Sequence, residues 1–230
     1  MRITSLAVIA ALSVVACSKP AATQAPETTN ASSIATAANT AGDKPSAAPQ
    51  KAEVGKPAPD FELKDLEGAS VKLSSFKGKT VVLEWFNPGC PFVRKSHDKG
   101  SLKEAAKRAT KDGVVWLAIN SSSEGKQGFG VETNKEAKAK WSLEHPILLD
   151  ASGDVGHTYG ATNTPHMMVI DKAGTLVYRG AIDNSPDAEG ESPTSGKLVH
   201  YVDDAIGALA AGKPLATTET KAYGCGVKYK

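Results

Sequence analysis

The stretch TVVLEWFNPGCPFVRK, residues 80–95, decides the fold. Its first half is a nearly continuous run of apolar and β-branched side chains, the pattern of a strand buried on both faces of a sheet. Its second half contains Pro91, which favours the first position of a helix because no backbone N–H is needed there. Cys90 is therefore expected where a buried strand ends and a helix begins, the edge at which α/β folds place their chemistry.

Further elements are expected on both sides of this stretch. Alternating apolar and polar residues predict an N-terminal β-hairpin over residues 61–73 and a second hairpin over residues 167–179. Helical sequence runs from 91 to 110, with an interruption at 98–100 and a capping box at 101–104 that restarts it. The other expected elements are strands at 114–120 and 147–149 and helices at 133–141 and 196–211. This order predicts an α/β fold with a central mixed, mostly parallel sheet that has helices on both faces.

The composition of the chain excludes some functions. The formal net charge is only +2 over 230 residues, which argues against nucleic acid as a partner because no basic stripe is available for phosphates. The 40% hydrophobic and 23% charged residues are typical of a globular protein. Three cysteines are too few for a disulfide scaffold, so each needs its own explanation. No phosphate-binding loop is present, and we expect no cofactor.

The N-terminus has the pattern of an export signal. Residues 1–16 combine a positive start with an apolar run that is too short to span a bilayer. The end of this run, before Cys17, resembles the lipobox of bacterial lipoproteins. We therefore expect a signal peptide over residues 1–16, lipidation of Cys17 and a periplasmic protein that contacts the membrane only through its lipid anchor. Ser18 favours the outer membrane by analogy with lipoprotein sorting, and an ordinary signal peptide is the alternative.

The rest of the chain divides into three parts. Residues 17–52 hold the lipidated cysteine and a segment rich in Ala, Thr, Pro and Ser, which is expected to be a disordered tether. Residues 53–213 are expected to form one folded domain. Residues 214–230 are expected to be a C-terminal tail that carries Cys225.

Cys90 is the candidate for chemistry. At the start of a helix, unpaired backbone N–H groups and the positive end of the helix dipole stabilise a thiolate, which is the reactive form of cysteine. Arg94, in the first turns of the expected helix, can add to this effect. The alternative is a buried, inert cysteine.

Two motifs resemble the thioredoxin-like superfamily. Residues 81–95 are similar to its active-site segment, and GATNTPHMMVID, residues 160–171, resembles its second signature. The resemblance implies a thioredoxin-like fold in which Pro165 is a cis proline that faces the active cysteine, with Thr164 beside it. NPGCPF, residues 87–92, resembles the peroxiredoxin-like redoxins, as does the Gly-Cys-x-x-Lys pattern at residues 224–228.

The departures from these families limit what can be carried over. The second cysteine of a thioredoxin motif would fall at Val93, so a local disulfide is impossible. The threonine and proline of the peroxiredoxin motif would fall at Asn87 and Leu83, so peroxidase activity does not follow directly. The resemblance nevertheless implies that a group of residues supports the active site: Glu84, Asn87, Pro88, Gly89, Pro91, Arg94, Thr164 and Pro165.

Cys90 and Cys225 are the only remaining pair once Cys17 is lipidated. We expect Cys90 to be the attacking thiol and Cys225 the resolving thiol of an exported oxidoreductase. Its substrate is expected to be a peroxide or a protein disulfide or thiol, and its electron donor an unknown thiol. The alternatives are a permanent disulfide that pins the tail of a non-catalytic binding module, or a free Cys225.

Other side chains allow more than one interpretation. Glu84 resembles the buried acid beneath thioredoxin-like active sites, or it points to solvent. His97 and His166 raise the weaker alternative of copper binding, although a packed loop histidine is at least as compatible with the pattern at His166, and no metal site is expected. Trp85 and Phe86 are expected in the core. The polar loops at residues 121–125 and 184–195 either shape the rim of the site or are solvated turns.

Overall fold

The structure is a computed structural model that describes residues 51–230. The expected signal peptide, Cys17 and most of the expected tether therefore lie outside the described residues. Ala52, at the end of the expected tether, is 4% exposed, and its backbone N–H donates to the Thr158 carbonyl at 2.9 Å. The fold thus includes Ala52.

A seven-stranded mixed sheet forms the centre of the fold, in the order β2-β1-β5-β4-β3-β7-β8. Parallel pairing is confined to β3 with β4 and β4 with β5, and the other four neighbouring pairs are antiparallel. The mixed sheet is confirmed, but the expectation that it is mostly parallel needs correction. The reason is that only the crossovers through helices produce parallel neighbours, whereas both hairpins and β7 run the other way. The strands are β1 (Glu62–Asp65), β2 (Ser70–Lys72), β3 (Val81–Trp85), β4 (Val115–Asn120), β5 (Ile147–Leu149), β7 (His166–Ile170) and β8 (Leu176–Gly180).

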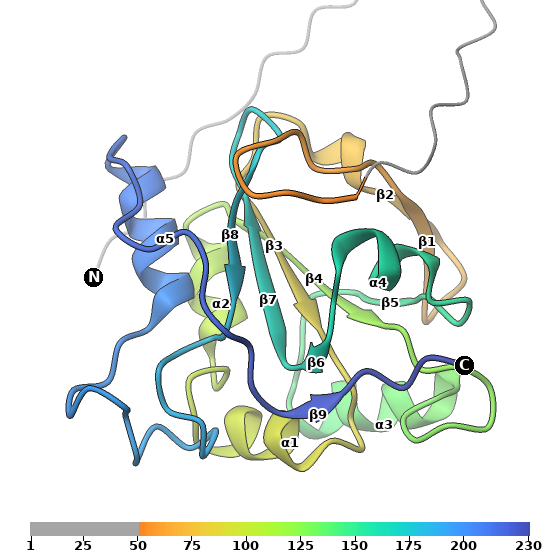
Figure 1. Ribbon diagram of the computed structural model, residues 1–230. Helices are drawn as coiled ribbons and strands as arrows, with labels where there is room; N and C mark the ends of the chain where they lie inside the picture. Colours follow the sequence, from red (N-terminus) through yellow and green to blue (C-terminus); the bar gives the residue numbers. More distant parts are fainter. Residues whose placement is uncertain (1–50) are drawn as a thin grey trace, which may run out of the picture. The chain divides into compact units, whose positions relative to one another are not determined.

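The helices differ from the expected ones mainly at their ends. They are the 3₁₀ helix η1 (Leu73–Phe76) and the α-helices α1 (Pro91–Asp98), α2 (Ala105–Lys111), α3 (Val131–Lys140), α4 (Asp154–Tyr159) and α5 (Tyr201–Ala210). Figure 1 shows α2 and α5 beside β3, β7 and β8, and α4 near β5 and β6. The short helix α4 was not expected from the sequence, and α5 begins five residues later than its pattern predicts.

The expected capping box at residues 101–104 is wrong. Glu104 precedes α2 in a left-handed conformation, with φ at 60°, and its side chain caps nothing. The Ser101 hydroxyl instead donates to the buried carboxylate of Asp183 and lies 3.1 Å from His200 Nδ1. A distant carboxylate therefore replaces the local backbone N–H as the partner of this serine.

Strand β3 passes through the middle of the core, and all five of its residues are buried. On one face Leu83 and Trp85 pack with Tyr159 and other apolar side chains. On the other face Val82 packs with Trp116 and the helices α2 and α5. This burial on both faces confirms the prediction made from residues 80–86, and it fixes the end of β3 as a rigid platform for Cys90.

The C-terminal segment lies against the fold. Strand β9 (Cys225–Gly226) pairs antiparallel with β6 (Asn163–Thr164) in a separate two-stranded sheet. Figure 1 shows β9 and β6 next to each other, close to the start of α1. None of the helices within residues 51–230 has the length and apolar composition of a membrane-spanning segment.

Candidate active site

Cys90 occupies the N-cap position of α1, and Pro91 takes the first helical turn, as the sequence predicts. The turn before it is braced by Asn87, which is fully buried. Its side-chain oxygen accepts from the Gly89 N–H at 2.8 Å, and its side-chain N–H donates to the Gln127 carbonyl at 3.0 Å. The Cys90 N–H donates to the Asn87 carbonyl at 3.0 Å. Pro88 is also buried in this turn, so the NPGC segment holds the thiol in one place.

Thr164 and Pro165 form the opposite wall of the site. The peptide bond between them is cis, which confirms the prediction for Pro165. The Cys90 thiol donates to the Thr164 carbonyl at 3.1 Å. The Thr164 hydroxyl is buried and has no hydrogen-bond partner in the described structure. The site therefore contains an unused donor next to the sulfur atom.

Cys225 approaches the same residue from the C-terminal segment. It is the β9 partner of Thr164, whose carbonyl accepts the Cys90 thiol. Both cysteines pack in one apolar cluster that includes Phe92, and both thiols are free. The structure thus brings together two cysteines that are separated by most of the domain in the sequence.

The two thiols differ in acidity. Burial opposes ionisation of Cys90, but the Cys225 side chain, the Val93 backbone N–H and the otherwise unpaired Thr164 hydroxyl can each donate to the thiolate, and they hold the pKa of Cys90 below the ordinary value. Burial and the hydrogen bond to Cys90 raise the pKa of Cys225 to about 11. Cys90 lies at the positive end of α1, so it is the thiol that ionises first. Cys225 is then a thiol that donates to the Cys90 thiolate.

Two expected support residues form no side-chain hydrogen bond to Cys90 in the part of the chain that the structure describes. Arg94 is exposed on α1 and forms no ion pair within residues 51–230. Glu84 is fully buried, and no hydrogen bond joins it to Cys90 in the described structure. It lies instead beside His97, near the C-terminal end of α1. Along the helix axis, His97 is about 10 Å from Cys90 at the N-terminal end.

Glu84 is the acceptor of a buried network. Its carboxylate oxygens lie 2.9 Å from His97 Nε2 and 2.9 Å from Trp116 Nε1. Burial raises the pKa of this carboxyl, but the interactions with His97, His145 and Trp116 together outweigh burial and lower it. The solvent-facing alternative for Glu84 is therefore wrong, and both of its oxygens already have partners.

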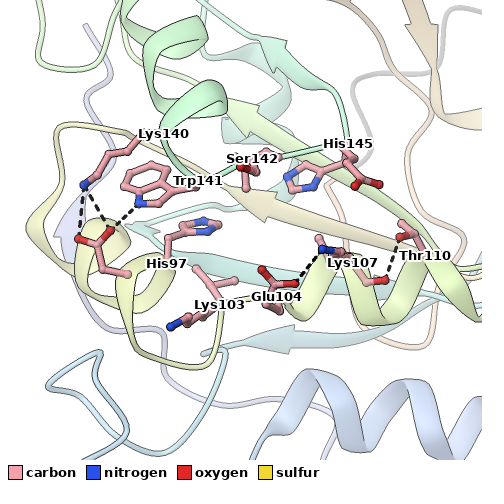
Figure 2. Close-up of a pocket in the computed structure, with 14 residues that line it drawn as sticks. His97, Lys103, Glu104, Lys107, Thr110, Lys140, Trp141, Ser142 and His145 are labelled. Carbon is pink, nitrogen blue, oxygen red and sulfur yellow. Dashed lines mark hydrogen bonds and ion pairs between the residues drawn. The ribbon is translucent and has the colours of Figure 1, made fainter.

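His97 separates Glu84 from a surface cavity of about 320 Å³. Figure 2 shows its ring beside that of Trp141, and the two rings stack with 4.9 Å between their centroids. His145 lines the other end of the cavity, and burial lowers its pKa to about 4. Neither cysteine is among the lining residues, so this cavity is not where the thiol chemistry takes place.

His166 is a packed histidine. It begins β7 opposite Trp85, and its Nδ1 accepts from the Thr162 N–H at 3.2 Å. Burial lowers its pKa to about 4. No group of three or more His, Cys, Asp or Glu side chains in residues 51–230 is arranged to hold a metal ion.

The two polar loops are built into the fold. Ser121, Ser122 and Ser123 are at most 3% exposed, whereas Glu124 and Gly125 form an exposed turn, so the expected solvated turn is confined to the end of residues 121–125. Ser122 contacts the Asn87 side chain at 3.3 Å, so this loop supports the turn before Cys90. The loop at 184–195 is closed by the Asn184 side chain, which donates to the Ser195 hydroxyl at 2.8 Å.

Sequence reasoning missed the anchors of the C-terminal segment. The Tyr223 hydroxyl donates to Asp183 at 2.7 Å, and the Tyr229 hydroxyl donates to the Ala161 carbonyl at 2.8 Å. The Tyr229 ring stacks on His157 with 4.0 Å between ring centroids. Aromatic residues in a segment otherwise interpreted as a tail were the one signal that it is docked.

Comparison with known proteins identifies the family to which the chain belongs. The sequence model of the family named Redoxin matches residues 53–195. The chain belongs to the Redoxin family. This redoxin is 30% identical to the thiol-disulfide oxidoreductase ResA of Bacillus thuringiensis subsp. konkukian over 131 residues, which cover 56% of the chain and 69% of that relative. It is therefore an oxidoreductase of the thioredoxin-like superfamily, as the sequence predicts.

Two solved structures extend the likeness over more of the redoxin. A hypothetical protein of Sinorhizobium meliloti 1021 is 26% identical, with a TM-score of 0.68 over 79% of this chain and 97% of its own. An uncharacterized conserved protein of Geobacillus kaustophilus is 29% identical, with a TM-score of 0.67 over 77% of this chain and 93% of its own. Both cover more of the chain than the family match does.

Proposed function

We propose that this redoxin is an exported oxidoreductase in which Cys90 attacks an oxidant and Cys225 resolves the product. The observation that carries the proposal is that both cysteines meet at Thr164, one by a hydrogen bond to its carbonyl and the other by strand pairing. The acidity of the two thiols gives the order of events, because the thiolate is the nucleophile.

With a hydroperoxide as oxidant, the Cys90 thiolate attacks the terminal oxygen and the O–O bond breaks. The alkoxide that leaves takes up one proton, and Cys90 becomes a sulfenic acid. The Cys225 sulfur then attacks the Cys90 sulfur, which forms the S–S bond and releases water. The Thr164 hydroxyl is placed to donate to the sulfur or to the peroxide oxygen, because it is buried beside the thiol without another partner.

With a disulfide as oxidant, Cys90 forms a mixed disulfide and one substrate thiolate leaves. Cys225 then attacks the Cys90 sulfur and releases the second substrate thiol. Both routes end in the same Cys90–Cys225 bridge. Two equivalents of an external thiol reduce that bridge and are themselves oxidised to a disulfide.

The test follows the bridge in the full chain. The protein is treated with one equivalent of hydrogen peroxide or of a model disulfide, and its peptides are mapped by mass spectrometry without reduction. The proposal predicts a Cys90–Cys225 bridge in the wild type. It predicts a trapped sulfenic acid or mixed disulfide on Cys90 in the Cys225→Ser variant, and no reaction in the Cys90→Ser variant. An oxidised Cys225 with an unreacted Cys90 would contradict it.

We further propose that the chain is lipidated at Cys17 and held at the periplasmic side of the cell envelope, with the outer membrane favoured. The short apolar segment that ends at Cys17 supports this proposal. The test is fractionation of cells that express the full chain, with mass spectrometry of its mature N-terminus. An acylated Cys17 in the membrane fraction, lost in the Cys17→Ser variant, is the expected result. A soluble chain with residues 1–16 still attached would contradict it.

A further inference from the structure

Strand β9 occupies an edge that a substrate could use. Its partner β6 pairs with no other strand of the described structure. The pairing is extended on one side by the Val227 N–H, which donates to the Thr162 carbonyl at 3.1 Å. On the other side the Asn163 side chain donates to the Gly224 carbonyl at 3.0 Å. If the segment left, the backbone of β6 would be open to any extended chain.

The same segment covers the reactive sulfur. Cys90 is completely inaccessible to solvent, whereas Cys225 is only partly buried. Gly224 lies so close to the backbone of Thr164 that an added Cβ would be 2.3 Å from the Thr164 carbonyl oxygen. The ring of Tyr223 is 6.4 Å from that of Phe92, which follows Pro91 in α1. Access to Cys90 therefore depends on where the segment lies.

Anchors on both sides of Cys225 hold the segment in this place. Before it, Tyr223 donates to the buried Asp183. After it, the Ser123 N–H donates to the Lys228 carbonyl at 2.9 Å. Tyr229 then packs where an added Cβ on Gly156 would lie 2.3 Å from its hydroxyl. Cys225 is thus presented to Cys90 in an extended strand that is fixed at its two ends.

We propose that residues 223–229 act as a built-in substitute for an extended substrate strand, so that small local displacements of the segment admit small oxidants to Cys90, whereas cysteine-bearing polypeptides are excluded until the whole segment leaves β6. When the segment leaves β6, the same edge binds an extended polypeptide by strand addition and presents its sulfur to Cys90. This inference rests on the proposed function, since it assumes that Cys90 is the attacking thiol. It names small oxidants as the substrate class and the C-terminal segment as the determinant of specificity.

The chain provides a matched pair of variants for the test. Gly224→Ala retains every side chain of the segment, but its Cβ collides with Thr164 and its φ of 105° is unfavourable for alanine. Gly226→Ala lies in the same segment, and its added Cβ meets nothing within 4 Å. Both are made in the full chain with Cys17→Ser and Cys225→Ser, so that Cys90 is the one remaining thiol. A third variant that ends after Tyr223 removes the strand altogether.

Two probes report on access to Cys90. One is the small disulfide dithiobis(nitrobenzoate), and the other is a short extended peptide whose single cysteine carries a thionitrobenzoate group. In each case the Cys90 thiolate attacks the disulfide, forms a new S–S bond and releases coloured thionitrobenzoate, so that one disulfide replaces another. The quantity measured is the ratio of the rate with the peptide to the rate with the small disulfide.

We expect this ratio to be low in the starting protein and in Gly226→Ala. It should rise about tenfold or more in Gly224→Ala and in the shortened chain, because the fraction of molecules with an open edge increases. An equal rate for both probes in the starting protein, or an unchanged ratio in a shortened chain that keeps its native circular dichroism, would overturn the inference. Failure of Cys90 to react with either probe in every variant would instead contradict the proposed function.

Discussion

Replacement of Glu84 separates a structural role of this carboxylate from a catalytic one. Glu84→Ala removes the acceptor for two buried donors, His97 Nε2 and Trp116 Nε1, which both lie 2.9 Å from its oxygens. Loss of one partner of a buried pair costs about 3–5 kcal/mol in the free energy of unfolding. For a domain of this size, that corresponds to a fall in Tm of roughly 10 °C. Glu84→Gln keeps one acceptor and leaves one donor without a partner, so its cost is about 1–3 kcal/mol.

The assay for this prediction has two parts. Urea unfolding measures the loss of stability, and the pH dependence of Cys90 alkylation measures its reactivity. We expect both variants to be destabilised, with an unchanged pH dependence of alkylation, because no hydrogen bond joins Glu84 to Cys90 in the described structure. A stable Glu84→Gln variant with a shifted alkylation profile would refute this reasoning and would favour a proton relay.

The acid stability of the network follows from the same geometry. Because the pKa of Glu84 is lowered from 4.5, its contribution to folding is complete above that pH and is lost as the pH falls through the lower folded-state value. The free energy of unfolding of the wild type, measured in urea, should therefore keep falling as the pH is lowered below 4.5.

Three further predictions concern other parts of the molecule. Burial lowers the pKa of His145 from 6.5 to about 4 in the folded state, so between these pH values only the unfolded chain binds the proton, and stability falls as the pH drops. His145→Phe removes this proton uptake and should reduce the loss in unfolding free energy between pH 7 and pH 5 by about 2 kcal/mol. Urea unfolding at the two pH values measures this difference. Thr164→Val removes a donor to the Cys90 thiolate and should slow alkylation of Cys90 at neutral pH roughly tenfold. An unchanged rate would show that the Thr164 hydroxyl does not stabilise the thiolate. Gly156→Ala places a methyl group where the Tyr229 side chain packs and should lower the free energy of unfolding by about 1–3 kcal/mol, measured in urea. The control is Gly207→Ala on α5, where an added Cβ meets nothing within 4 Å, and it should raise the free energy of unfolding by about 0.5–1 kcal/mol. Equal changes in stability in the two variants would contradict the packing of Tyr229 against Gly156.

The fold and the thiol pair were predictable where local sequence sets the structure. The apolar run of β3, the proline after Cys90 and the threonine-proline pair before β7 are local signals, and the structure places all three as expected. Cysteine counting then paired Cys90 with Cys225, and both lie at Thr164.

The features that sequence reasoning missed depend on distant partners. Ser101 donates to the buried carboxylate of Asp183, which is distant in the sequence, instead of accepting from a backbone N–H as a helix cap would. The direction of β1 against β5 is set by the closure of the sheet and not by either strand alone. The C-terminal segment has weak local propensity, and its order comes from contacts made by Tyr223 and Tyr229.

The most direct test of the central claim is the reduction potential of the Cys90–Cys225 pair. The full chain with Cys17→Ser is equilibrated in a glutathione or dithiothreitol series, and the bridge is quantified by mass spectrometry. The two-cysteine mechanism predicts a reversible bridge that opens at about −200 mV or at a higher potential, as labile and catalytic disulfides do. A bridge that resists reduction below about −300 mV would mark a structural disulfide and favour a binding module. The absence of any bridge would contradict the two-cysteine mechanism.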